Sequence, residues 1–122
     1  MKYTLFIGRW SPFHCGHKYI IDTYVRNNKS VCIAIRDSKE KYSLDLRKKM
    51  IRSCYKEEIR EGRVKIIVIP DIETVAVGRD VGYSIVEVPD NIRLISGTKI
   101  RQNLCYELPS PVKKVLENNN EK

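Results

Sequence analysis

The stretch YTLFIGRWSPFHCGH, residues 3–17, decides the fold that we expect for this chain. An apolar segment, 2–7, predicts a strand, and a short turn that begins at Gly8 leads to residues 16–27, whose apolar positions recur at helical spacing. A strand that turns directly into a helix is typical of an α/β fold. Glycine lets the backbone approach a ligand closely, and the free N–H groups at a helix start attract anions. We therefore predict a phosphate site in this turn.

The same alternation of strand and helix continues along the first half of the chain. Residues 30–36 and 63–69 predict two more buried strands, and Ser43 is the expected N-cap of an intervening helix that runs to about residue 61. Helical connections of this length imply parallel strands covered on both faces. We predict an α/β fold: a single Rossmann-like domain over 1–116, with a mostly parallel sheet of four to five strands flanked by helices. Residues 117–122 read as a flexible tail.

The second half of the chain has a less regular pattern. Residues 75–77 follow the third strand too closely for a parallel crossover, so they are either part of a loop over the site or an antiparallel strand. A short helix is expected at 81–88, although its valines, isoleucine and tyrosine also suit a strand. Residues 92–95 predict the last core strand, 98–106 a helix, and 112–118 a terminal helix after Pro109 and Pro111.

Composition limits the classes of protein to consider. The 122 residues carry a net charge of +8, but the basic residues are scattered and lack interleaved aromatics, which argues against nucleic acid as a partner. A solvated basic surface and a basic cleft for a polyanionic substrate both remain open. The four cysteines have no CxxC spacing, which favours free thiols. No apolar run approaches the roughly 20 residues of a membrane span, and no signal peptide is recognised, so we expect a cytoplasmic protein with no membrane partner.

The two histidines of the chain, His14 and His17, lie in one turn at the predicted helix start. Ligands of open α/β sheets bind at the carboxyl ends of the strands, which is where this turn lies. Two imidazoles there can donate hydrogen bonds to phosphate oxygens without being permanently charged. The alternatives are a pair that only caps the helix, and a zinc site for which no third ligand is apparent.

His14-Cys15-Gly16-His17 resembles the HxGH signature of the nucleotidylyltransferase superfamily. Residues 95–101, ISGTKIR, resemble the second signature of that family, ISxTxIR, and the two motifs stand in the family's order. Residues 8–14 are also similar to the Gly-Arg-aromatic-x-Pro-Phe-His segment of archaeal-type nicotinamide-mononucleotide adenylyltransferases. The resemblance covers roughly residues 2–105, most of the chain.

The resemblance implies that His14, His17 and Arg101 act on the phosphates during catalysis. The residues that we expect to bind or shape the nucleotide site are Gly8, Arg9, Trp10, Pro12, Phe13, Gly16, Arg47, Arg79, Asp80, Ser96, Gly97 and Thr98. Several of these residues also have an interpretation other than nucleotide binding. We expect Trp10 to pack in the turn in preference to stacking on a base. The alternative for Arg47 is a solvated basic helix face, and the alternative for Ser96 and Thr98 is a plain N-cap. Arg79 and Asp80 lie between two glycines, a pattern typical of a sharp turn near a ligand or of an ordinary turn.

The reaction implied by the resemblance is transfer of a nucleoside monophosphate to a phosphorylated small-molecule acceptor, with release of pyrophosphate and with Mg²⁺ accompanying the triphosphate. ISxTxIR favours AMP from ATP, and a cytidylyltransferase using CTP or a non-catalytic nucleotide-binding regulator are the alternatives. Gly97 stands where many adenylyltransferases have serine, and the acceptor-binding segment is compressed into 70–90, so the acceptor cannot be carried over. The small size of the chain suggests a homo-oligomer.

Overall fold

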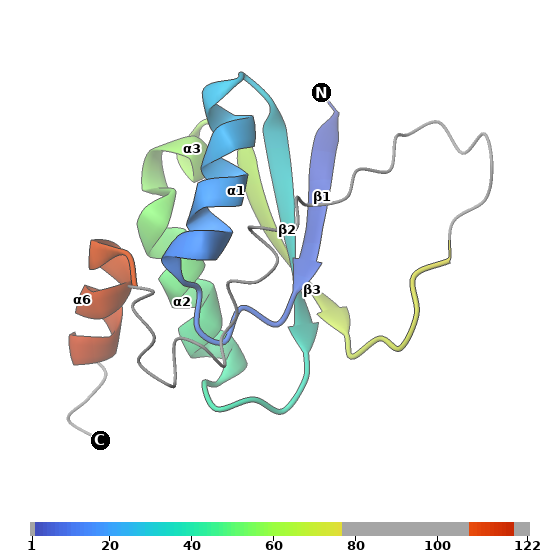
Figure 1. Ribbon diagram of the computed structural model, residues 1–122, viewed down its shortest axis with the longest axis vertical. Coiled ribbons are helices and arrows are strands. Elements are labelled where there is room, and N and C mark those ends of the chain that lie inside the picture. The colour runs from blue at the N-terminus through green and yellow to red at the C-terminus, as the bar shows by residue number, and fades with distance from the viewer. Residues whose placement is uncertain (1, 77–107, 119–122) are drawn as a thin grey trace.

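The computed structural model describes residues 2–76 and 108–118 (Figure 1). The elements, in chain order, are β1 (Tyr3–Gly8), α1 (Cys15–Arg26), β2 (Ser30–Asp37), α2 (Leu44–Cys54), α3 (Lys56–Arg60), β3 (Val64–Pro70) and α6 (Ser110–Asn118). The segments predicted at 81–88, 92–95 and 98–106 lie outside the described residues. None of the helices in the described ranges is long and apolar enough to span a bilayer.

The three described strands form a parallel sheet in the order β1-β2-β3. Leu5 pairs with Cys32 and Ile33 with Ile66, so the strands are in register across the sheet. The described part of the chain confirms a mixed α/β fold in which helices flank a parallel sheet. Because the strands are parallel, β1, β2 and β3 all end at the same edge, and the loops that follow them share that edge.

The described helices cover one face of the sheet. Figure 1 shows α1, α2 and α3 on the same side of the strands, with α6 on the outer side of α2. Val31, Ile33 and Ile35 of β2 point into this layer and are fully buried, each contributing roughly 1.5–3 kcal/mol of burial free energy. On the other face Leu5 is 54% exposed and Ile67 41% exposed. The core of the described part therefore lies between the sheet and α1–α2.

The helix predicted from residue 43 to about 61 is divided into two. Ser43 caps α2 as expected, since its hydroxyl accepts a hydrogen bond from the Leu46 amide. Tyr55 then leaves helical geometry, with φ −134° and ψ 37°, while its side chain stays buried. Gly62 ends the second piece with φ +81°, a conformation that glycine adopts without strain.

The start of α6 differs from the prediction for 112–118, and its end overlaps the predicted tail. The helix begins at Ser110, with Pro111 in its first turn, where the missing proline N–H costs no helical hydrogen bond. It ends at Asn118, so two residues of the range read as a tail are helical. The cysteines Cys15, Cys32 and Cys54 are free thiols.

Candidate functional site

The site lies at the carboxyl edge of the sheet, where residues 9–14 connect β1 to α1 and residues 38–43 connect β2 to α2. The first loop carries the histidine motif into the first turn of α1. The second loop runs beside it, because β1 and β2 are neighbours in the sheet. This is the edge at which parallel α/β sheets bind ligands.

His14 and His17 form a reciprocal cap at the start of α1. His14 is the N-cap residue, and its Nδ1 accepts hydrogen bonds from the amides of Gly16 (3.1 Å) and His17 (3.4 Å). In return, His17 Nδ1 accepts a hydrogen bond from the His14 amide (3.3 Å). The capping interpretation is therefore confirmed for these two nitrogens. It also corrects the expectation that these helix amides are free to bind an anion.

The Nε2 atoms of His14 and His17 take no part in the cap. A nitrogen that accepts from an amide carries no proton, so each neutral imidazole holds its proton on Nε2. The His14 side chain is fully buried, and its Nε2 has no hydrogen-bond partner among the described residues. The two rings stack with centroids 3.7 Å apart and planes 16° apart, so both are held in fixed orientation. An unpaired buried donor is costly and requires an acceptor.

Burial keeps both imidazoles neutral. It lowers the pKa of His14 from 6.5 to about 4, only partly opposed by the backbone hydrogen bond. The pKa of His17 is also lowered, first by burial and then by repulsion from His14. At pH 7 the pair therefore offers N–H donors without adding positive charge.

Trp10 fills the space that the absence of a side chain at Gly8 leaves open. A Cβ atom at Gly8 would lie 2.9 Å from Cε2 of the indole, closer than packed atoms tolerate. The indole is buried, and its Nε1 donates to the carbonyl oxygen of Ala34 in β2 (2.9 Å). Trp10 thus packs in the turn. Gly8 makes room for the indole ring, whereas the sequence predicted that it makes room for a phosphate.

Phe13 packs against His17, and Pro12 precedes Phe13 in the same turn. Both are buried, and the Phe13 ring stacks on His17 with centroids 5.8 Å apart and planes 27° apart. Trp10 meets the same imidazole edge-on, with ring centroids 4.7 Å apart. His17 is therefore enclosed by aromatic rings, which fix its orientation and explain why its charged form is disfavoured.

Arg47 is the largest departure from what the sequence led us to expect. Its side chain is 1% exposed, so the solvated-face interpretation is wrong. The guanidinium donates to four backbone carbonyl oxygens, those of Arg9, Arg36, Ser38 and Tyr42, at 2.9–3.0 Å. These bonds occupy four of its five N–H groups. Arg47 ties the loop after β1 to the loop after β2, and so shapes the site from within.

Arg9 and Arg36 differ in how strongly other residues of this chain hold their guanidinium groups. The Arg9 side chain is 63% exposed and reaches Glu40 only at 3.8 Å, so it is free to turn toward an anion. Arg36 donates to Asp71 Oδ1 (2.8 Å) and to the Ile72 carbonyl (2.9 Å), which holds the segment after β3 against β2. Arg9 is therefore a cation of the described site that is available to a ligand.

Tyr55, which was not among the predicted site residues, supports the start of α1. Tyr55 is buried, its ring lies 6.1 Å from Phe13, and its hydroxyl donates to Asp22 Oδ1 (2.8 Å). Burial and Asp22 raise the pKa of Tyr55. Lys18 pairs with the other oxygen of Asp22 at 2.7 Å. Tyr55 follows Ile51 by four residues, so helical spacing could have placed it on the buried face.

The remaining predicted site residues are not described by the structure. Arg79, Asp80, Ser96, Gly97, Thr98 and Arg101 all lie in the range 77–107, outside the described residues. Within 2–76 and 108–118, no group of three or more histidine, cysteine, aspartate or glutamate side chains gathers to hold a metal ion. The described half of the site thus consists of the histidine pair, its aromatic support, Arg47 and Arg9.

Comparison with known proteins adds no relative. Neither a scan against protein-family models nor a search of curated protein sequences returns a significant match to this chain.

Proposed function

We propose that this protein is a nucleotidyltransferase that moves a nucleoside monophosphate, AMP from ATP, onto a phosphorylated small-molecule acceptor and releases pyrophosphate. The observation that carries the proposal is the His14 Nε2 donor, which is buried, oriented and without a partner among the described residues. It lies at the ligand-binding edge of a parallel sheet, beside a second imidazole. Phosphate oxygens are strong acceptors that satisfy such a donor.

The histidine pair suits the charge changes of this reaction. An oxygen of the acceptor phosphate attacks the α-phosphorus, the new P–O bond forms, and the bond to the bridging oxygen breaks as pyrophosphate leaves with its electron pair. Such a transfer depends on positioning and on stabilising charge on the phosphoryl oxygens. Neutral imidazoles held by their own caps can donate from Nε2 with no reorganisation during the step. Arg9 would add positive charge at the same edge.

The second motif would complete the site if the sheet continues. We propose a Rossmann-like fold of four to five strands in which residues 92–95 pair with the outer edge of β1, the strand nearest the histidine loop. Residues 96–101 would then begin a helix beside His14 and His17. Ser96, Gly97 and Thr98 would cradle the outer phosphates, Arg101 would contact a phosphate, and Arg79 and Asp80 would border the nucleotide.

No step of this proposal is assigned to a metal ion. We propose that Mg²⁺ arrives with the triphosphate and is held by its phosphate oxygens. The alternatives, a cytidylyltransferase and a regulator that binds a nucleotide without turnover, differ from the proposal in donor and in product.

Calorimetric titration with ATP, CTP, GTP and UTP, each with Mg²⁺, followed by an assay for pyrophosphate release, tests the proposal. We expect ATP to bind most tightly, and pyrophosphate to appear when phosphorylated acceptors are screened. Tight CTP binding would favour the cytidylyltransferase. Binding without turnover across the screen would favour the regulator. No binding of any triphosphate, with or without the phosphorylated acceptors, would contradict the proposal.

His17→Ala and Thr98→Ala test the two halves of the site separately. Loss of the His17 donor should lower turnover roughly a hundredfold if its hydrogen bond strengthens in the transition state. Thr98→Ala should weaken triphosphate binding, measured by the same calorimetry. Unchanged affinity would reduce Thr98 to a helix cap, and unchanged turnover in His17→Ala would remove that residue from the chemistry.

A further inference from the structure

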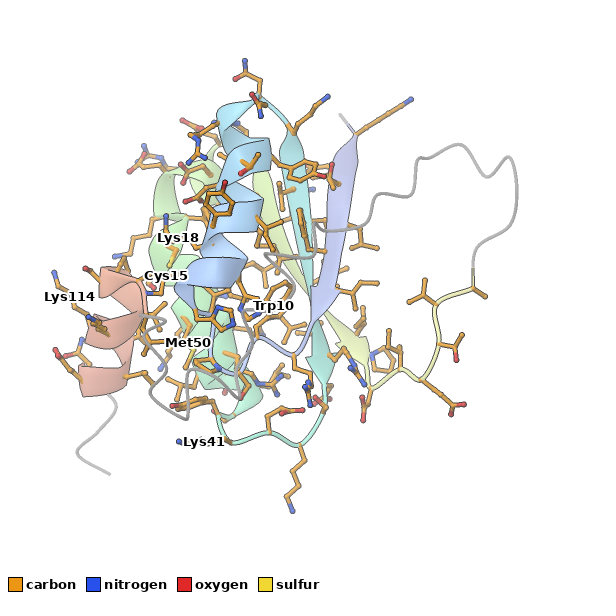
Figure 2. All side chains as sticks on the ribbon, in the orientation of Figure 1. Trp10, Cys15, Lys18, Lys41, Met50 and Lys114 are labelled. Atoms are coloured by element: carbon orange, nitrogen blue, oxygen red, sulfur yellow. The ribbon has the colours of Figure 1, made fainter. Side chains whose placement is uncertain are left out.

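A groove on the outer side of the helical layer lies apart from the histidine site. One wall comes from Lys49, Arg52 and Ser53 of α2, continued by Lys56 at the start of α3, and the other wall comes from α6. The groove has two overlapping parts of about 350 Å³ each. Figure 2 shows Lys114 of α6 at the outer edge of the molecule, with the helices between it and Trp10. The groove is therefore a separate surface.

The rim of the groove is cationic on both sides. Lys49, Arg52 and Lys56 line one part of the groove, Lys56 and Lys114 line the other, and all four side chains are exposed. No acidic residue lines the groove among the described residues, and none of these four makes an ion pair there. Four unpaired cations around one concavity create a positive potential that attracts an anionic partner.

The floor of the groove is apolar. Pro111 and Val115 of α6 form it, and both are half-buried. Val115 also packs against the hydrophobic core, so this floor is rigid. No aromatic side chain lines the groove among the described residues, whereas grooves for single-stranded nucleic acid combine cations with aromatic rings on which bases stack. The groove therefore suits an occupant with carboxylates on its sides and aliphatic groups on its lower face better than it suits a nucleic acid.

The α6 wall has helical spacing. Its lining residues Pro111, Lys114, Val115 and Asn118 recur at three- and four-residue steps, which makes one stripe about 10 Å long. A second helix of two to three turns fits along such a stripe, as amphipathic helices do in other grooves. Its acidic residues would reach Lys114 on one side and Lys49, Arg52 and Lys56 on the other.

We propose that the groove between α2 and α6 binds an acidic amphipathic helix of a partner protein. The partner is recognised by glutamate or aspartate on both flanks of an aliphatic stripe. The cationic rims would speed the association and favour a partner with acidic flanks. The apolar floor would favour a partner whose aliphatic residues form a stripe along one helical face.

Fluorescence anisotropy with three labelled probes tests the proposal. The first probe is a synthetic 14-residue peptide with leucines on one helical face and glutamates on its flanks. The second is a scrambled peptide of the same composition, and the third is a single-stranded 15-nucleotide RNA. The groove variant is Lys49→Gln/Arg52→Gln/Lys56→Gln. Its matched control, Lys2→Gln/Lys29→Gln/Lys65→Gln, removes the same three charges from exposed positions elsewhere.

We expect the amphipathic peptide to bind at least tenfold more tightly than its scrambled form. The groove variant should bind it roughly tenfold more weakly, and the control should bind within twofold of the unaltered protein. The single change Lys114→Glu, checked for folding by circular dichroism, should weaken binding as well. Equal binding of both peptides, an equal loss in the control, or RNA binding that depends on the groove more than peptide binding does would overturn the proposal.

Discussion

His14→Asn separates the two functions that we assign to the two nitrogens of His14. Asparagine is among the best N-cap residues, and its side-chain oxygen can accept from the Gly16 and His17 amides as Nδ1 does now. It cannot supply the donor that Nε2 offers on the far side of the ring. We therefore expect a helix that still starts at residue 15, in a protein that has lost at least a hundredfold in turnover.

The expected stabilities follow from the contacts of the ring. His14→Asn keeps the cap and loses the stacking contact with His17, worth about 1 kcal/mol, while its own Nδ2 amide group is a buried donor in place of Nε2. The free energy of unfolding should therefore fall by about 1 kcal/mol. His14→Ala also loses the stack, and in addition it loses the cap, about 1 kcal/mol, and leaves a larger cavity. It should be about 2 kcal/mol less stable than His14→Asn.

Urea unfolding, followed by circular dichroism, and pyrophosphate release would be measured on both variants in parallel. Full turnover in His14→Asn would mean that Nε2 plays no part in the reaction. Equal destabilisation of the two variants would mean that the cap contributes little, and that His14 is held by packing alone.

Three further predictions concern the support of the site. Because burial lowers the pKa of His14 from 6.5 to about 4, the unfolded chain binds more protons than the folded one in this range, so stability should fall by about 3 kcal/mol as the pH drops from 6.5 to 4. Unfolding measured across that range should show a shallower slope in His14→Asn, and equal slopes would contradict the assignment. Arg47→Lys keeps the charge but cannot reach four carbonyl oxygens, so the free energy of unfolding should fall by about 3 kcal/mol, against less than about 0.5 for the exposed neighbour Lys49→Met. Gly8→Ala should displace the indole of Trp10, seen as a red shift of its fluorescence and a loss of about 1–3 kcal/mol, and an unshifted spectrum would show that the turn yields elsewhere.

The elements that depend on local sequence could be predicted well. β1 and β2 lie within one residue of their expected ranges, α1 starts one residue early, and Ser43 caps α2 as its side chain and position indicated. These features follow from apolar spacing and capping chemistry, which act over a few residues.

The features that depend on contacts distant in sequence were missed. The helix break falls at Tyr55, whose hydroxyl reaches Asp22, 33 residues earlier, although the five-residue step from Cys54 to Ile59 already departs from helical spacing. Arg47 lies three and four residues before Met50 and Ile51, both fully buried, so its position on the inner face could have been recognised. Its charge obscured this signal, because arginine is rarely buried unless its donors are paired.

The exchange of hydrogen bonds between His14 and His17 has a consequence for how such a chain could evolve. One nitrogen of each ring caps the helix and the proposed reaction would use the other, so selection on the helix and on that reaction would act on the same two residues. A lineage that gave up turnover would still be under pressure to keep a capping side chain at residue 14. Replacement by asparagine or serine there would be the expected trace of lost activity, and histidine at both positions would be expected where the helix and the proposed reaction are both maintained.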